Sequence, residues 1–172
     1  MSPTRGTWLG PDAFDALLLE GRPLLDLRAP TEFIKGTLPG ATNHPLLSDD
    51  QRAQVGRCYK QEGHDAAVRL GHRLVSGATR AERIQAWGAW AKAHPKGALY
   101  CFRGGQRSQI TQSWLAEAGI EVPGITGGYK ALRQHLISII DRESPRLPWR
   151  VVGGRTGVGK TRFLETLPRA LD

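Results

Sequence analysis

Cys101 stands where a thiol could act as a nucleophile. It ends a short apolar segment, 97–101, that is predicted to be a strand, and a helix is predicted from Ser108 to Ala118. The residues behind the cysteine include two arginines and a pair of glycines: Phe102, Arg103, Gly104, Gly105, Gln106, Arg107 and Ser108. Inward-facing backbone amides and a helix N-terminus stabilise an anion or a thiolate at such a place. We therefore interpret Cys101 as a reactive thiol in an anion-binding loop, rather than as a buried residue at the end of a strand.

A second motif has the residues of a phosphate-binding loop. Residues 154–161 fit the pattern G-x-x-x-x-G-K-[ST] without a mismatch: Gly154, Arg155, Thr156, Gly157, Val158, Gly159, Lys160 and Thr161. The motif lies between a predicted strand at 150–152 and a predicted helix at 161–167, which is its usual context. Lys160 would reach the terminal phosphates of a ligand, and Thr161 could hold Mg²⁺.

The segments before the cysteine are predicted to supply the elements that position it. A buried strand is expected over 23–28, with Asp26 and Arg28 at its carboxyl end, where open α/β sheets bind ligands. Apolar spacing together with Ser, Gly and Pro as start and stop residues indicates further helices and a short edge strand. The helices are expected over 11–20, after Ser48, after Gly63, over 80–95 and from Gly127-Gly128 onward, and the edge strand over 120–122.

The order of these elements predicts an α/β domain over residues 1–143. Two prolines in four residues, Pro145 and Pro148, mark a linker at 144–149. The remainder, 150–172, is predicted to hold the first strand, loop and helix of a P-loop domain. Only eleven residues follow the motif, so we expect a truncated segment that binds nucleotide or diphosphate weakly at best.

Composition sets limits on the class of protein. The chain has 172 residues, of which 40% are hydrophobic and 23% charged, and no apolar run approaches the ~20 residues that span a bilayer. With no secretory signal at the N-terminus, we expect a cytoplasmic protein. The net charge of +8 favours nucleic acid or phosphorylated ligands, although a basic surface without a partner would give the same charge. The second cysteine, Cys58, lacks such a loop and is interpreted as structural, or less favourably as a resolving thiol.

Several segments resemble the rhodanese domain family. The opening resemblance is carried by 25–28, by Glu32-Phe33 and by 36–43, with Thr37 as a departure because many members carry His there. This resemblance implies a rhodanese-like fold with a central parallel sheet flanked by helices. It also implies that the loop cysteine, here Cys101, carries sulfur or selenium as a persulfide or perselenide.

The whole pattern resembles one family more narrowly, that of the tRNA 2-selenouridine synthases. The segments 59–63, 70–71, 101–108 and 127–130 carry it together with the phosphate loop. The family replaces the sulfur of wobble-position 2-thiouridine with selenium from selenophosphate, through an S-geranylated intermediate made from geranyl diphosphate. The resemblance implies that Cys101 carries selenium, that Arg103 and Arg107 hold selenophosphate, and that the phosphate loop takes a diphosphate. It implies tRNA as partner and no tightly bound cofactor; oligomeric state stays open.

Three other functions fit parts of the sequence. A thiosulfate-type sulfurtransferase would use the same cysteine loop but has no need of a diphosphate site. Cys101 and Arg107 also have the C-x5-R spacing of cysteine phosphatases of the rhodanese fold, and a selenophosphate donor would need the same spacing. A tRNA-binding module with an inactive cysteine is the non-enzymatic alternative.

Overall fold

The computed structural model describes residues 6–167 of the chain. Its contacts divide the chain into two compact units, Met1–Ser138 and Ile139–Asp172, so that the boundary falls inside helix α7 (Gly128–Glu143). The predicted division at 143 and the predicted linker at 144–149 remain predictions. The two units are described separately below.

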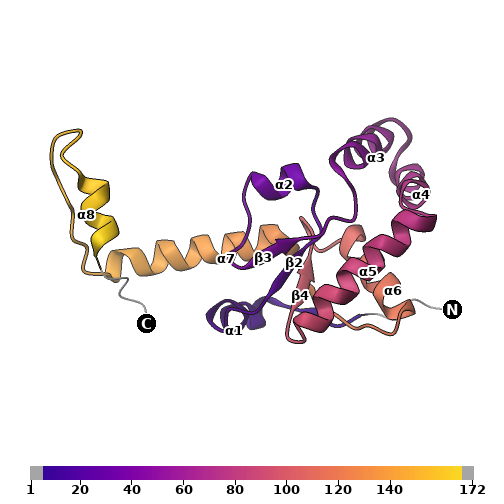
Figure 1. Ribbon diagram of the computed structural model, residues 1–172, viewed down its shortest axis with the longest axis horizontal. Coiled ribbons are helices and arrows are strands. Elements are labelled where there is room, and N and C mark those ends of the chain that lie inside the picture. Colours follow the sequence, from indigo (N-terminus) through magenta and orange to yellow (C-terminus); the bar gives the residue numbers. More distant parts are fainter. Residues whose placement is uncertain (1–5, 168–172) are drawn as a thin grey trace. The chain divides into compact units, whose positions relative to one another are not determined.

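The first unit is built on a five-stranded sheet in which every strand pair is parallel. The strands lie in the order β1-β5-β4-β2-β3, so β4 is the central strand and β2 its neighbour. Figure 1 labels β2, β3 and β4. Their bounds are β1 Trp8–Leu9, β2 Leu24–Asp26, β3 Ala41–Asn43, β4 Ala98–Tyr100 and β5 Gly124–Ile125. The parallel sheet with helices along the connections confirms the predicted α/β class.

Helices of the first unit begin and end at the residue types that favour those positions. Ser48 caps α3, because its hydroxyl accepts a hydrogen bond from the Gln51 amide while the Gln51 side chain accepts one from the Ser48 amide. Gly63 then turns the chain into α4 with a φ of 85°, a conformation that favours glycine. The bounds are η1 Pro11–Ala13, α1 Phe14–Leu19, α2 Pro30–Ile34, α3 Asp49–Glu62, α4 His64–Leu74, α5 Gly77–Ala93 and α6 Gln106–Glu117.

Apolar side chains cover both faces of the sheet. Because successive strand residues point to opposite faces, Leu25 and Leu99 join one core cluster while Leu24, Ala98 and Tyr100 join another. The first cluster includes tryptophans of α5 and α6, and the second includes residues of α1 and α7. Burial on both faces is typical of parallel sheets, and it holds the carboxyl end of β4 in a fixed place.

Two predicted strands are wrong. The edge strand expected at 120–122 does not form, because the side chain of Gln112 donates to the Val122 carbonyl at 3.0 Å and the pairing strand is Gly124–Ile125 instead. The strand expected at 150–152 is also absent from the described residues, and Val151 is 92% exposed there. A strand is stabilised by a neighbour, and no other described segment of the second unit pairs with this one.

The second unit contains the end of α7, the short η2 (Ser144–Arg146) and α8 (Lys160–Thr166). The helix predicted at 161–167 is therefore confirmed to within one residue at each end. Among the helices of residues 6–167, none is long and apolar enough to cross a membrane.

Candidate functional site

Cys101 follows the last residue of β4, and α6 begins at Gln106, so a turn of five residues, 101–105, joins the central strand to the helix. The last three predicted loop residues, Gln106, Arg107 and Ser108, lie in the first turn of that helix. No backbone amide from 102 to 108 donates a hydrogen bond to another described residue. These amides at the turn and at the helix N-terminus are thus not used within the described residues, and such amides can bind an anion.

The cysteine itself is nearly enclosed. Cys101 is 3% exposed and belongs to the core cluster that contains Leu27 and Leu99, whereas Phe102 and Arg103 on the turn are exposed. The hydroxyl of Ser108 is also buried, and it has no hydrogen-bond partner among the described residues. A reactant can therefore meet this sulfur only at the turn, because the rest of its surroundings are packed core.

A second glycine turn fixes the cysteine turn from outside. The amide of Tyr129 donates to the Cys101 carbonyl at 2.9 Å, and the amide of Lys130 donates to the Phe102 carbonyl at 3.0 Å. Gly104 and Gly128 have φ angles of 62° and 57°, and their backbones approach each other too closely for a side chain. Gly127-Gly128 was predicted to open a helix, and the structure adds that this turn supports the cysteine.

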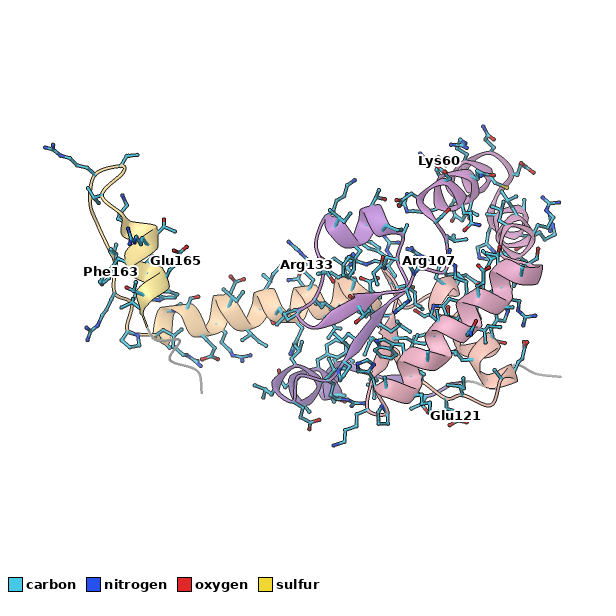
Figure 2. All side chains as sticks on the ribbon, viewed as in Figure 1. Lys60, Arg107, Glu121, Arg133, Phe163 and Glu165 are labelled. Carbon is cyan, nitrogen blue, oxygen red and sulfur yellow. The ribbon has the colours of Figure 1, made fainter. Side chains whose placement is uncertain are left out.

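Arg107 is held by a carboxylate that the site prediction did not include. Its guanidinium donates to the two carboxylate oxygens of Glu32 at 2.6 and 3.3 Å, and Arg52 contacts the same carboxylate at 3.1 Å. In Figure 2, Arg107 lies at the side of the sheet where α2 and α3 are found. Burial by itself would raise the pKa of Glu32, but the hydrogen bond and the charge of Arg107 outweigh it, and the pKa is lowered. The ionised carboxylate of Glu32 therefore orients the guanidinium of Arg107.

The ion pairs of Glu32 give stability a pH dependence. A carboxyl group whose pKa is lowered on folding stabilises the protein above its ordinary pKa, here 4.5, and this contribution is lost as the pH falls through the lowered value. Glu32→Gln is therefore expected to reduce the free energy of unfolding at pH 7 by about 1–3 kcal/mol. The difference between wild type and variant should shrink from pH 5 to pH 3, as measured by urea unfolding. A constant difference over this range would contradict the assignment.

Asp26 and Arg28, predicted to support the site, form a buried pair beside it. The Arg28 guanidinium donates to the Asp26 carboxylate at 2.6 and 3.0 Å and to the Gly36 carbonyl at 2.8 Å. It also lies 3.8 Å from the ring centre of Tyr129, whose amide holds the Cys101 carbonyl. The pair therefore acts on the cysteine turn through Tyr129.

Arg103 is placed differently from Arg107. Its side chain is exposed, and its guanidinium lies 5.9 Å from the ring centre of Phe102. Hence one of the two predicted anion-binding arginines has freedom to move toward a ligand, and the other is fixed by Glu32. The sequence could not distinguish them.

Cys58 lies on α3, where its sulfur is 3.7 Å from a carboxylate oxygen of Glu62. Partial burial and the neighbouring carboxylate raise the pKa of the Cys58 thiol. A raised pKa disfavours the thiolate, and this supports the interpretation of Cys58 as a structural residue.

The phosphate-loop residues of the second unit are exposed or half-buried. The ammonium group of Lys160 donates to the carbonyls of Gly154 and Arg155, both at 2.9 Å. Gly157 and Gly159 have φ angles of 85° and 86°, and α8 starts at Lys160. The lysine thus lies over the loop that its motif would wrap around a phosphate.

A parallel sheet, a cysteine at the carboxyl end of its central strand, and a glycine turn into a helix define the first unit as a rhodanese-like domain. The solved N-terminal domain of a candidate ATP/GTP binding protein from Clostridium difficile 630 has a TM-score of 0.64 and 26% identity with this chain, over 76% of this chain and 99% of that one. A rhodanese-related protein from Thermoplasma volcanium matches at a TM-score of 0.45 and 16% identity, over 75% of this chain and 92% of that one. No family model matches the chain.

Two curated relatives of this chain are both named tRNA 2-selenouridine synthase. The chain is 55% identical over 159 residues to the tRNA 2-selenouridine synthase of Shewanella loihica and 58% identical over 160 residues to that of Bordetella bronchiseptica. Each match covers 92% of this chain, but the chain spans only 43% and 44% of the two relatives' length. The resemblance predicted from the sequence is confirmed: over these residues the chain is homologous to tRNA 2-selenouridine synthases.

Proposed function

We propose that this chain is the cysteine-bearing part of a tRNA 2-selenouridine synthase, in which selenium from selenophosphate replaces the sulfur of 2-thiouridine. The observation that carries the proposal is the 55–58% identity to enzymes of this name over 92% of the chain. The structure supports it with a single cysteine at the carboxyl end of β4, within a turn of free amides. Cys101 is the residue that would carry or deliver selenium.

The amides of 102–108 and the exposed Arg103 are the groups that would hold the selenophosphate anion. Arg107, already paired with Glu32, would add a fixed positive charge rather than a mobile one. Charge-assisted hydrogen bonds from such groups are stronger than those of neutral donors. The net charge of +8 suits tRNA as the second substrate, because neutralising phosphates dominates such affinity, and a tRNA substrate would place the reaction in the cytoplasm.

Geranyl diphosphate is the proposed second small substrate. Attack of the thiocarbonyl sulfur on geranyl diphosphate would release diphosphate and turn that sulfur into a thioether. The selenium of selenophosphate, already at the selenide level, would then attack the same carbon and expel geranylthiolate, and water would cleave the Se–P bond to release phosphate. The exchange then needs no oxidant or reductant. The phosphate loop, with Lys160 and with Thr161 as the residue that could hold Mg²⁺, is the proposed site for the diphosphate.

Replacing Cys101 is the direct test of this function. In cells that carry the whole protein, Cys101→Ala is expected to abolish 2-selenouridine in tRNA, as measured by mass spectrometry of tRNA nucleosides. The control is Cys58→Ala, which removes the other thiol of the chain and is expected to leave 2-selenouridine at the wild-type level. Undiminished 2-selenouridine in the Cys101 variant would refute the role of this cysteine.

The C-x5-R spacing keeps a phosphatase as the second candidate, because Arg107 does lie in the first turn of α6 behind the cysteine turn. Hydrolysis of an aryl phosphate by the wild-type chain, lost in Cys101→Ser, would favour that function. Release of thiocyanate from thiosulfate and cyanide, without any effect on tRNA, would instead favour a plain sulfurtransferase.

A further inference from the structure

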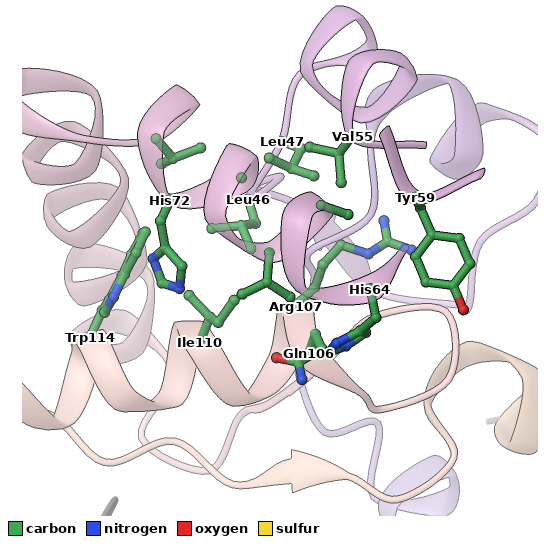
Figure 3. Close-up of a pocket in the computed structure, with 14 residues that line it drawn as sticks. Leu46, Leu47, Val55, Tyr59, His64, His72, Gln106, Arg107, Ile110 and Trp114 are labelled. Carbon is green, nitrogen blue, oxygen red and sulfur yellow. The ribbon is translucent and has the colours of Figure 1, made fainter. Parts of the chain in front are cut away.

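An apolar cavity of about 210 Å³ lies in the first unit between the α3–α4 hairpin and α6 (Figure 3). One wall is formed by α6 and the opposite wall by α4, while residues after β3 and on α3 close it. The lining residues that matter for the argument are Leu46, Ala67, Val68, Gln106, Arg107 and Trp114. None of this cavity was foreseen from the sequence.

The chemistry of the lining selects the kind of ligand. Nearly all of its surface is carbon, and the guanidinium of Arg107, the charged side chain at its edge, is held in an ion pair with Glu32. Such a cavity offers few partners to the polar edges of a nucleobase, and burying those edges without hydrogen bonds is unfavourable. The volume is also below the range of about 300–1,000 Å³ for drug-sized ligands. A short hydrocarbon chain satisfies both conditions.

The cavity begins next to the cysteine turn. Gln106 and Arg107 start α6 directly after that turn, and Trp114 lies eight residues further, about 12 Å along the helix. Figure 3 shows Gln106, Arg107 and His64 at one end and Trp114 with His72 at the other. A hydrocarbon ligand lying in the cavity would therefore have one end near the cysteine turn and the other near Trp114.

We propose that this cavity holds the isoprenoid chain of the S-geranylated thiouridine, with the base at the cysteine turn. The assignment rests on the proposed function and adds to it a site, in the rhodanese-like unit, for the ten-carbon chain. The geranyl group would anchor the intermediate while selenium is delivered. The geranyl carbon bonded to sulfur would lie at the end of the cavity beside Gln106 and Arg107.

Two neighbouring alanines of α4 allow a matched test. Ala67 lines the cavity and is 4% exposed, whereas Ala66 precedes it on the same helix and does not line the cavity. Titration calorimetry would compare the nucleosides S-geranyl-2-thiouridine and 2-thiouridine. The wild-type chain and Ala66→Phe are expected to bind the geranylated nucleoside at least about tenfold more tightly. Ala67→Phe, which fills the cavity, is expected to lose this preference.

The assignment would be refuted if Ala67→Phe kept the wild-type preference for the geranylated nucleoside, or if the wild-type chain showed no such preference. If thermal unfolding shows that Ala67→Phe does not fold, Ile110→Ala serves instead. It enlarges the cavity on the α6 side, and it should shift the preference from the geranylated toward the farnesylated nucleoside. An unchanged preference in that variant would equally refute the assignment.

The outcomes for the site and for the proposed function are separable. Cys101→Ala is expected to keep the preference for the geranylated nucleoside, because Cys101 does not line the cavity. If this variant still makes 2-selenouridine, the role of Cys101 fails while the cavity assignment stands. If selenation depends on Cys101 but the preference survives in Ala67→Phe, the cavity assignment alone fails.

Discussion

Replacing Gly128 by alanine is expected to lower the free energy of unfolding by about 2–5 kcal/mol, because two costs combine at this position. Gly128 has a φ of 57°, where a side chain costs about 1–2 kcal/mol. A Cβ atom there would also lie 2.2 Å from the Cys101 carbonyl oxygen and 2.6 Å from the Gly104 amide nitrogen. Both are backbone atoms of the cysteine turn, so no flexible side chain can move aside.

Gly119→Ala is the matched control for this prediction. Gly119 has a φ of 73°, but a Cβ atom there would meet nothing within 4 Å. It should therefore show only the conformational cost, about 1–2 kcal/mol. The measurement is urea unfolding followed by tryptophan fluorescence, with midpoints compared at equal slope. Similar losses in the two variants would show that the contact between the glycine turn and the cysteine turn is not tight.

The central strands could be predicted from the sequence because their signal is local. The apolar run that contains β2 ends in charged residues, and β4 is bounded by Gly97 and by the cysteine turn. By contrast, β1 and β3 escaped prediction, since they are the partly exposed edge strands of the sheet and do not lie in a fully buried apolar run. Their strand geometry comes from pairing with β5 and β2, which no local pattern reveals.

The misplaced strand at 120–122 has the same origin. An apolar-polar-apolar triplet is typical of a short strand, but the carbonyl of Val122 is occupied by the side chain of Gln112. The ladder therefore starts two residues later, at Gly124, a glycine that lies against the ring of Trp8 on β1. The alternation of residue types could indicate a strand nearby, but only the packing of Gln112 and Trp8 determines its register.

The site was predictable where its residues are adjacent in the sequence. Cys101 and the turn behind it form one continuous segment, and its strand–turn–helix context can be predicted from local pattern. The partner of Arg107 could not be predicted in this way, because Glu32 is 75 residues away. A signal for it was present in the rhodanese resemblance, which includes Glu32-Phe33. The apolar cavity gave no local signal, because its walls come from separate helices.

Asp26→Ala is expected to reduce the free energy of unfolding by about 3–5 kcal/mol, because it leaves a buried guanidinium without its carboxylate. The side chains of Asp26 and Arg28 are 0% and 2% exposed, and three of their contacts are 3.0 Å or shorter. Burial by itself would lower the pKa of Arg28, but the hydrogen bond and charge of Asp26 raise it, so the guanidinium stays charged in the folded protein. Water cannot reach it to replace the lost partner.

Glu117→Ala is the control, because it breaks an ion pair of the same chemistry at the surface. Arg80 and Glu117 have side chains that are 36% and 58% exposed, so water can solvate the arginine that remains. The expected loss is at most about 1 kcal/mol, since exposed ion pairs contribute little. Urea unfolding of both variants at pH 7 gives the comparison. If Asp26→Ala were as mild as Glu117→Ala, water or another acceptor would have to reach Arg28, and the buried pair could not be what holds Tyr129 against the cysteine turn.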